Sequence, residues 1–375
     1  MAVPSPHMAR LKRTDTLLAG KATAEGTRGY EQRFSSAHEP DFYRPFADGL
    51  HVSSLGLGTY LGECDDAEDQ RYAQTISLAL RRGINLLDTA INYRCQRSER
   101  AVGSALRSSV ASGAVNRDEV VVCTKGGYIP LDWCPPNTRE GYRGFLQSEY
   151  FGPGVMTPSD VVAGGHCLTQ RYLADQIGRS RRNLGIECID VYYLHNPEQQ
   201  LEVIESAQFR DVIRAAFTTL EEQVSRGAIG VYGCATWQGF RVPPSSRNHL
   251  GLEALLEIAV EAGGKGHHFR AIQLPVNLAM AEAARLPTQQ LAGNGLVPAL
   301  EAAAQLGVSV VGSATLMQSQ LTRSLPAELG AAFPGFASDA QRAIAFARSM
   351  PVSVALVGMK AAEHLEENLQ PAVAV

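Results

Sequence analysis

Eight short apolar runs rich in β-branched residues recur along the chain, and amphipathic stretches separate most of them. Three of those stretches, residues 67–83, 169–185 and 209–227, have the period of a helix. Alternating strands and helices favour parallel pairing through right-handed crossovers, and eight parallel strands can close without leaving an edge. The sequence therefore predicts an α/β fold, a (β/α)8 TIM barrel. The apolar runs are residues 52–57, 84–88, 119–124, 189–194, 229–235, 271–276, 308–312 and 353–357.

An open, doubly wound sheet is the competing fold for this pattern. It would be expected to carry a GxGxxG loop after an early strand, and GLGTYLG (residues 56–62) has the wrong spacing. The sequence also lacks GxxxxGK[ST] and GxSxG, so neither a P-loop nor a nucleophile elbow is supported. The barrel is the favoured interpretation.

Two regions stand outside the regular alternation. Residues 1–48 are polar and weakly periodic, and we interpret them as an N-terminal arm before a barrel at 49–375. Residues 126–168 form a long loop after the third strand, far beyond the usual connection of about 2–6 residues. This loop is rich in aromatic residues and prolines, which favours a wall of a substrate pocket. A subunit contact or a cover for the barrel rim is the alternative.

Composition excludes several classes of protein. The chain has 375 residues, 45% hydrophobic, and its net charge of −4 gives no basic face for nucleic acid or an anionic membrane. The longest uncharged run, 302–322, is too polar for a membrane span, and the first residues lack the apolar core of a secretory signal. Seven scattered cysteines without CxxC indicate free thiols and a cytoplasmic location. No metal site is expected, because His166-Cys167 and His267-His268 lack further ligands.

Charged and polar residues stand where the predicted strands end. Asp88 ends the second strand, Lys125 follows the third and His195 ends the fourth, while Tyr93 lies in the loop after the second. In a closed barrel the carboxyl ends of the strands meet on one face. We therefore expect these four side chains to lie close together.

The four residue types fit one chemistry. A phenol has a pKa near 10, and an adjacent Lys125 cation would lower the pKa of Tyr93. Asp88 would hold the ammonium, and His195 could orient a carbonyl. The set describes a tyrosine that protonates an oxygen, an effect worth about 10²–10⁴ in rate. Taken singly, the four could instead be a helix cap, rim packing, a solvated lysine and a core histidine.

Several motifs resemble, in order and spacing, the aldo-keto reductase superfamily over about residues 50–371. They are GLGTYLG, GINLLDTAINY, VVVCTKGG, IDVYYLHNPE and GMKAAEHLEENL. The resemblance implies that Tyr93 is the general acid, Lys125 its activator, Asp88 the partner of the lysine and His195 the residue that orients the carbonyl. It also implies an NAD(P)H-dependent oxidoreductase for a small carbonyl or alcohol substrate, with the cofactor laid across the barrel mouth. A regulatory or sensing barrel with little turnover is the alternative, and the oligomeric state stays open.

The same resemblance implies cofactor and substrate residues. Gln273 matches the residue that binds the nicotinamide carboxamide, and Ala235-Thr236 stand for a usual Ser-Asn pair, of which Thr236 keeps a hydroxyl. Gly312 replaces a stacking aromatic, and Ser313 falls in the pyrophosphate region. At the adenosine end Lys360 could meet a 2′-phosphate, which favours NADP over NAD, or be an ordinary surface lysine. The remaining expected contacts are His364, Glu367 and Asn368 for the cofactor and Tyr60, Trp133 and Trp237 for the substrate.

Overall fold

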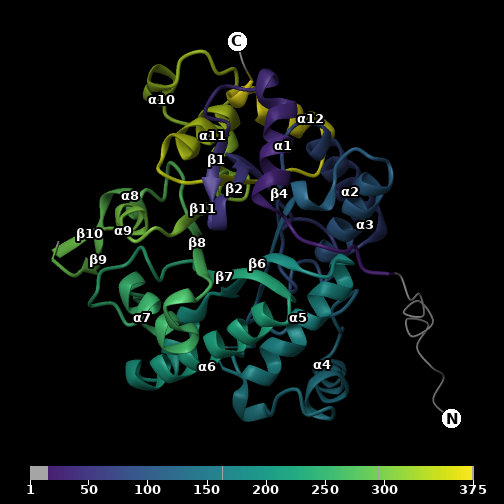
Figure 1. Cartoon of the computed structure of the whole chain (residues 1–375), viewed down its shortest axis with the longest axis vertical. Helices are drawn as coiled ribbons and strands as arrows, with labels where there is room; N and C mark the ends of the chain where they lie inside the picture. The colour runs from purple at the N-terminus through teal and green to yellow at the C-terminus, as the bar shows by residue number, and fades with distance from the viewer. Residues whose placement is uncertain (1–15, 163, 294, 374–375) are drawn as a thin grey trace.

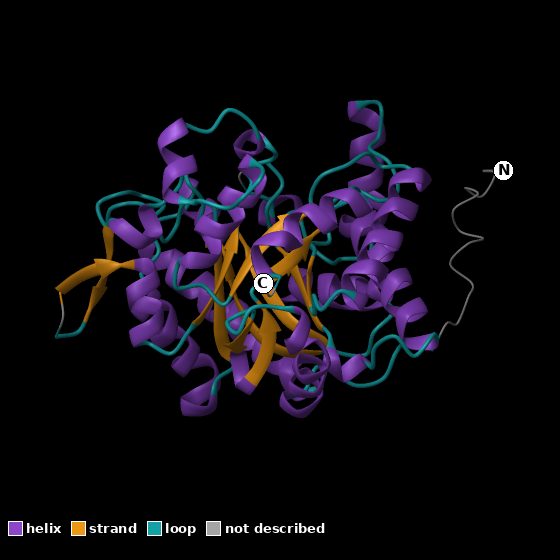
Figure 2. Ribbon diagram, turned by 90° about the horizontal axis from the view of Figure 1, so that it is seen from above, coloured by secondary structure: helices purple, strands orange, loops and turns teal. Residues whose placement is uncertain are grey.

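The computed structural model describes residues 16–162, 164–293 and 295–373, and within these ranges eight parallel strands form a closed barrel. Figure 2 shows the strands at the centre with helices around them. Each predicted apolar run overlaps one barrel strand, so the predicted fold class is confirmed. The barrel strands, in the order of the chain, are β3 (Leu55–Gly58), β4 (Leu86–Asp88), β5 (Val121–Gly126), β6 (Ile189–His195), β7 (Ile229–Ala235), β8 (Phe269–Pro275), β11 (Ser309–Ser313) and β12 (Val354–Gly358).

Helices cover the outside of the barrel (Figure 1). The three predicted amphipathic stretches become α2 (Asp66–Arg81), α5 (Gln170–Leu184) and α6 (Ser206–Ser225). The Asp65 side chain caps α2 by accepting from the Glu68 N–H, and Gly185 ends α5 with a φ of 66°. The other helices packed around the barrel are α3 (Arg97–Ala111), α7 (Leu252–Gly263), α9 (Ala299–Gln305), α11 (Asp339–Ser349) and α12 (Ala362–Leu369).

A two-stranded antiparallel hairpin closes the amino end of the barrel. It pairs β1 (Tyr43–Phe46) with β2 (Leu50–Ser53), so the apolar run 52–57 is divided between β2 and β3. Phe46, Leu50 and Val52 belong to the same buried cluster as the residues that point into the barrel. The hairpin therefore fills the end of the barrel opposite the carboxyl ends of the strands.

The described part of the expected arm, residues 16–48, packs on the barrel. Helix α1 (Ala24–Phe34) begins at Thr23, whose side chain accepts from the Gly26 N–H. The buried Tyr30 hydroxyl donates to the carbonyl of Leu80 (2.6 Å). Residues 16–48 are thus part of the folded body, and residues 1–15 lie outside the described residues.

The long segment 126–168 is folded rather than an open loop. It contains α4 (Arg139–Leu146), a π-helical turn at Gln147–Phe151 and a 3-10 turn at Pro158–Asp160. It packs around a small apolar cluster of its own with Tyr172 of α5. The members of this cluster from within the segment are Leu146, Tyr150, Met156 and Cys167.

A second hairpin projects at the edge of the molecule, at the left of Figures 1 and 2. It pairs β9 (Pro287–Leu291) with β10 (Gly295–Pro298) and follows the short helix α8 (Glu282–Arg285). Another short helix, α10 (Ala327–Ala332), precedes α11. The apolar pattern did not indicate these elements, because each has only four to six residues.

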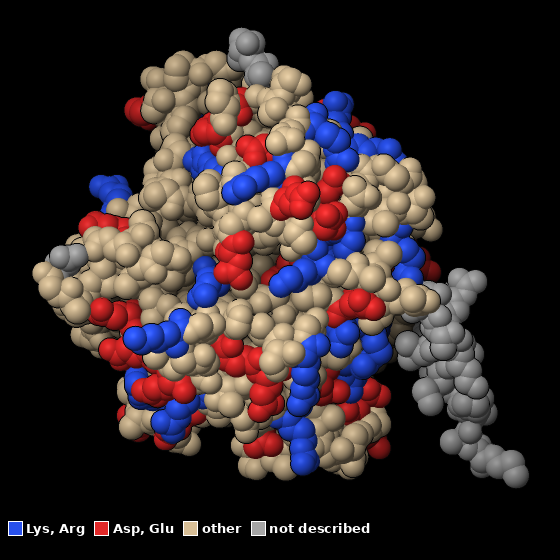
Figure 3. Space-filling model, in the orientation of Figure 1, with Lys and Arg blue, Asp and Glu red and all other residues tan. Residues whose placement is uncertain are grey.

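Acidic and basic side chains alternate over the face shown in Figure 3, in keeping with a net charge of −4. None of the described helices is long and apolar enough to cross a membrane.

Candidate active site

Lys125 and Asp88 form a buried ion pair at the carboxyl ends of β5 and β4. The Lys125 ammonium lies 2.5 and 2.9 Å from the two oxygens of Asp88 and donates to the Thr89 carbonyl (2.9 Å). The Gln273 amide also donates to Asp88 (2.8 Å). Burial alone would lower the pKa of Lys125, but the adjacent Asp88 carboxylate raises it. Lys125 is therefore a cation at neutral pH.

Tyr93 lies directly beside this ammonium. The Lys125 nitrogen is 5.1 Å from the centroid of the Tyr93 ring. Burial raises the pKa of Tyr93, and the cation of Lys125 acts against that increase without cancelling it. The expected lowering by Lys125 is present but is outweighed by burial. The phenol is consequently protonated at neutral pH, as a proton donor must be.

His195 faces Tyr93 from the end of β6, with the two ring centroids 5.8 Å apart. Burial and the Lys125 cation lower the pKa of His195 well below its usual value. The ring is therefore neutral at physiological pH. Its Nδ1 atom is buried and has no hydrogen-bond partner among the described residues.

A second histidine holds the backbone of His195. His166 is fully buried, and its Nε2 donates to the His195 carbonyl (2.7 Å) while the Gln200 amide donates to Nδ1 (2.7 Å). Burial lowers the pKa of His166 to about 4, so this ring is neutral too. Gly127 makes room for the contact, because a Cβ there would lie 2.7 Å from His166 Nε2. The residues around His166 in the sequence do not indicate this structural role, and His166-Cys167 stood out only as a pair that lacks further metal ligands.

A cavity of about 460 Å³ opens above these groups at the barrel mouth. Five of the residues expected to bind cofactor or substrate line it together with Asp88, Tyr93 and His195. These five are Tyr60, Thr236, Trp237, Gln273 and Ser313. Tyr60 packs edge-on against Tyr93, with ring centroids 5.0 Å apart.

The cavity contains polar atoms suited to a ligand. The Thr236 and Thr315 hydroxyls are buried in its wall and have no hydrogen-bond partner among the described residues. Buried hydroxyls without partners are unusual in a folded protein. A nicotinamide dinucleotide, with its amide and phosphate groups, would satisfy such atoms, so the lining fits this cofactor.

The small residue at the end of β11 that faces the cavity is Ser313, not Gly312. A Cβ on Gly312 would contact Val276 and Val352 on the outer side of the strand. Because side chains alternate along a strand, Ser313 points into the mouth and lines the cavity. Gly312 therefore does not face the cavity, and Ser313 is the residue of this strand end that does.

The structure places Trp133 outside the cavity, contrary to expectation. Its indole lies beside the guanidinium groups of Arg97 and Arg100 from α3, at 4.5 and 4.6 Å from the ring centroid. Of the whole segment 126–168, the described residue that lines the cavity is Tyr128. The segment contributes to the site through Tyr128 and His166 rather than as a broad wall.

The residues expected at the adenosine end do not line this cavity either. Lys360 pairs with the buried carboxylate of Glu68 (2.7 Å). The other three lie on α12, with Asn368 buried and His364 exposed. They are His364, Glu367 and Asn368.

Several polar residues that line the cavity were not assigned from the sequence, and Asn92, Tyr128 and Asn196 are three of them. Asn92 and Tyr128 line the cavity, and Asn196 lines it while donating to the Tyr128 hydroxyl (2.8 Å). Each lies within four residues of the end of a barrel strand, so counting a few residues past each strand end would have found them. Within the described ranges, no group of three or more His, Cys, Asp and Glu side chains is placed to hold a metal.

Two kinds of comparison place these features among known proteins. At the level of sequence, the chain is 28% identical over 191 residues to D-threo-aldose 1-dehydrogenase of a Pseudomonas species, covering 50% of this chain and 51% of that protein. It is 24% identical over 201 residues to prostaglandin-E(2) 9-reductase of Oryctolagus cuniculus, covering 53% and 46%. The chain thus spans about half the length of the curated relatives it matches.

Solved structures share the fold over most of the chain. An aldo-keto reductase from Bacillus halodurans in its holo form superposes with a TM-score of 0.56 at 19% identity, covering 88% of this chain and 90% of the other. An aldo/keto reductase from Klebsiella pneumoniae in complex with NADP and acetate gives 0.51 at 18%, covering 87% and 88%. The model of the Aldo/keto reductase family matches residues 54–242, which is half of the chain. The protein belongs to the aldo/keto reductase family.

Proposed function

We propose that this protein is an NAD(P)H-dependent carbonyl reductase, able to run as an alcohol or aldose dehydrogenase in reverse. The observation that carries the proposal is the Lys125–Asp88 ion pair placed beside Tyr93, at the base of a cavity that His195 also lines. A buried cation beside a protonated phenol favours transfer of the phenol proton to a substrate. Packing of the barrel does not by itself require such a charged pair.

Each residue has a distinct part in that proposal. The Tyr93 hydroxyl donates its proton to the carbonyl oxygen of the substrate as that oxygen gains negative charge. Lys125 favours the phenolate that results, and Asp88 keeps the ammonium in place. The neutral His195 can donate an N–H to the same oxygen and orient it. When bound, a nicotinamide cofactor supplies the hydride.

The lining of the cavity supports an uncharged substrate. Asp88 is the one charged side chain among the described lining residues, because His195 is neutral, and Lys125 neutralises Asp88. Tyr60, Tyr128 and Trp237 supply aromatic surface around the mouth. An anionic substrate would find no cation there to pair with, whereas a neutral carbonyl compound can pack on the rings.

Cofactor contacts are assigned as part of the same proposal. Thr236 and Gln273 would hold the nicotinamide amide, and Ser313 would lie near the pyrophosphate. We propose NADP rather than NAD because the ammonium of Lys360, which pairs with the Glu68 carboxylate, can instead bind a 2′-phosphate. A 2′-phosphate would replace Glu68 as the partner of this ammonium.

A regulatory barrel with little turnover is the second candidate. It is favoured by Ala235, which lines the cavity but cannot form a side-chain hydrogen bond to the nicotinamide. The chain is 25% identical over 195 residues to a putative voltage-gated potassium channel subunit beta from Schizosaccharomyces pombe. Steady oxidation of NADPH by the wild-type protein with a panel of neutral aldehydes and ketones would exclude this candidate.

Tyr93→Phe tests the proposed chemistry. We expect kcat to fall by at least about 100-fold, because proton donation contributes about 10²–10⁴ in rate. Affinity for NADPH, measured by titration, should change little, since the phenyl ring remains. A variant that keeps more than about a tenth of the wild-type kcat would show that Tyr93 is not the general acid.

A further inference from the structure

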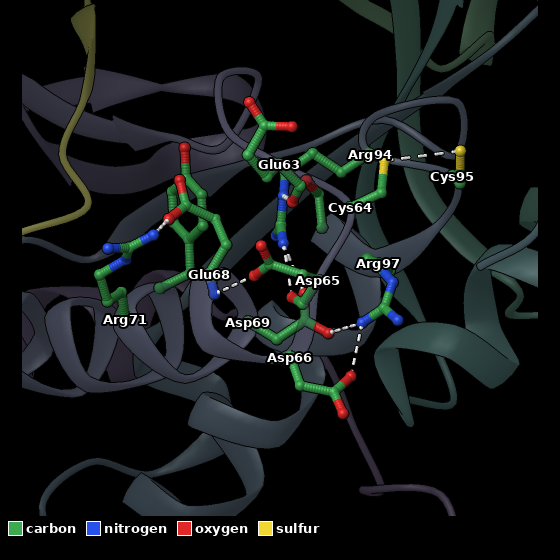
Figure 4. Close-up of polar contacts among 12 residues, drawn as sticks. Glu63, Cys64, Asp65, Asp66, Glu68, Asp69, Arg71, Arg94, Cys95 and Arg97 are labelled. Atoms are coloured by element: carbon green, nitrogen blue, oxygen red, sulfur yellow. Dashed lines mark hydrogen bonds and ion pairs between the residues drawn. The ribbon is translucent and has the colours of Figure 1, made fainter. Parts of the chain in front are cut away.

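Two cysteine thiols from different loops meet beside the candidate active site. The Cys64 sulfur lies 3.6 Å from the Cys95 sulfur, and both residues are free thiols. Cys64 is in the loop between β3 and α2, and Cys95 comes two residues after Tyr93 in the loop between β4 and α3. Figure 4 shows the two sulfurs facing each other across the gap between the loops. A disulfide has a sulfur–sulfur distance of about 2.05 Å, so a shift of roughly 1.5 Å would join them.

Charged contacts hold the two loops in this position. Arg94 donates to the Glu63 carbonyl (2.8 Å) and pairs with the Asp69 carboxylate (2.6 Å). Arg97 pairs with Asp69 (2.5 Å) and with Asp66 (3.0 Å). The residues on either side of Cys95 are therefore attached to the segment that contains Cys64, and the two thiols stay together without a covalent bond (Figure 4).

The backbone around Cys95 is in an unusual conformation. Arg94, Cys95 and Gln96 have φ values of 48°, 54° and 66°, which is the left-handed region. Three consecutive residues with side chains rarely adopt it, because each Cβ is crowded by the backbone. Such strain persists only where surrounding contacts impose it, and it gathers at functional sites. A small displacement of Cys95 can therefore take its backbone out of the left-handed region into a less crowded conformation.

Exposure differs between the two thiols. Cys64 is half-buried, whereas Cys95 is 9% exposed. Burial raises the pKa of Cys95 to about 12, with a further increase from Cys64. Cys64 is therefore the thiol that an oxidant in solution reaches first. Cys95 lies beside it as a protonated thiol that can react with the oxidised Cys64.

We propose that Cys64 and Cys95 form a reversible disulfide that lowers the activity of the enzyme when peroxide is present. The Cys64 thiolate attacks hydrogen peroxide, the O–O bond breaks, and a sulfenic acid forms with release of hydroxide. That hydroxide removes the proton of the Cys95 thiol and becomes the first water. The Cys95 thiolate attacks the Cys64 sulfur, the S–O bond breaks, and the hydroxide that leaves takes a proton from solvent to give the second water. In sum, two thiols and one peroxide give one disulfide and two waters. A dithiol restores both thiols by exchange.

The effect on catalysis rests on the proposed function. The disulfide would join the loop that carries Tyr60 to the loop that carries Tyr93, two aromatic rings with centroids 5.0 Å apart. Closing the gap between the sulfurs moves the backbone next to Tyr93. A displacement of about 1 Å in a catalytic group can reduce the rate by about 100-fold. We expect kcat to fall by about tenfold or more, since both loops share the movement.

The test uses the full-length protein treated with hydrogen peroxide and then alkylated. Peptide mapping without reduction should show Cys64 linked to Cys95, with kcat lowered about tenfold and restored by dithiothreitol. Cys64→Ser and Cys95→Ser should each have near-normal kcat before treatment, and neither should lose kcat about tenfold with peroxide, because neither can form the Cys64–Cys95 cross-link. Cys134→Ser is the matched control, because Cys134 is an exposed cysteine, and this variant should respond as the wild type does.

Three results would overturn the proposal. After saturating peroxide, Cys64 and Cys95 could both still react with the alkylating reagent as free thiols. Alternatively, Cys134 could be the partner in the cross-link. The cross-link could also form while kcat stays as high as in the dithiol form, which would remove the regulatory role. The mass measurement does not depend on turnover. A cross-link in a protein that reduces no carbonyl even with dithiothreitol would instead overturn the proposed function.

Discussion

The Lys125–Asp88 pair joins catalysis to stability at the level of single residues. Both side chains are nearly inaccessible to solvent, so each charge depends on the other. Removing one partner of a buried ion pair typically costs about 3–5 kcal/mol, because the remaining charge is left in a poorly polarisable surrounding. We expect Lys125→Met and Asp88→Asn each to lower the free energy of unfolding by about that amount.

The double variant should be more stable than the sum of the two effects suggests. With Lys125→Met and Asp88→Asn combined, no uncompensated charge remains, and much of the lost stability should return. Urea unfolding of the wild type, the two single variants and the double variant at pH 7 measures the coupling free energy between Lys125 and Asp88. Strictly additive losses would mean that the two side chains do not depend on each other in the folded state.

How far single residues could be predicted depended on local signals. The four proposed catalytic residues could be identified because each ends or follows an apolar run that forms a barrel strand. Trp133 could not be placed in this way. Its backbone is left-handed, with a φ of 59°, and two arginines of α3 determine where its ring lies. Nothing in the residues next to Trp133 in sequence indicates those contacts.

At the level of elements, His166 connects the end of segment 126–168 to β6. Its ring is neutral in the folded protein because its pKa is about 4, against about 6.5 when the chain is unfolded. The unfolded state therefore binds an extra proton between these two values. Stability that is fully present above pH 6.5 is lost as the pH falls towards 4. This one histidine should reduce the free energy of unfolding by about 2 kcal/mol between pH 7 and pH 5.

His166→Gln isolates that contribution. Glutamine keeps an N–H for the His195 carbonyl and an oxygen for the Gln200 amide, but it does not titrate. Unfolding free energies at pH 7 and pH 5 should differ less in the variant than in the wild type, by about 2 kcal/mol. All other histidines are common to both proteins. Parallel pH profiles would show that His166 is not held neutral by the fold.

Elements with a strong apolar period were predictable, and elements set by distant contacts were not. The eight barrel strands follow from their β-branched runs, including the run 52–57, although its division between β2 and β3 depends on pairing with β1. Helix α1 has a weak apolar pattern, and it is fixed by buried contacts such as that of Tyr30 with Leu80. Those contacts join parts of the chain that are far apart in sequence, so a local pattern cannot reveal them.

The whole molecule separates stability from chemistry along the barrel axis. The amino end is filled by the hairpin of β1 and β2, and the carboxyl end holds the cavity with Tyr93. In barrels of this kind the amino face serves stability and the carboxyl face serves catalysis. Substitutions at the amino end should therefore mainly lower stability, and substitutions at the carboxyl end should mainly change turnover.

Phe46→Ala and Tyr60→Ala test that separation as a matched pair. Phe46 is 4% exposed in the amino-end cluster, so its truncation should lower the free energy of unfolding by about 3–5 kcal/mol and leave kcat and KM of the folded protein unchanged. Tyr60 is 53% exposed at the cavity, so its truncation should cost about 1 kcal/mol and raise KM for aromatic carbonyls several-fold. Urea unfolding and steady-state kinetics on both variants measure the two effects. A change of kcat/KM in Phe46→Ala at a temperature where the protein is fully folded would mean that the amino end also positions the active site.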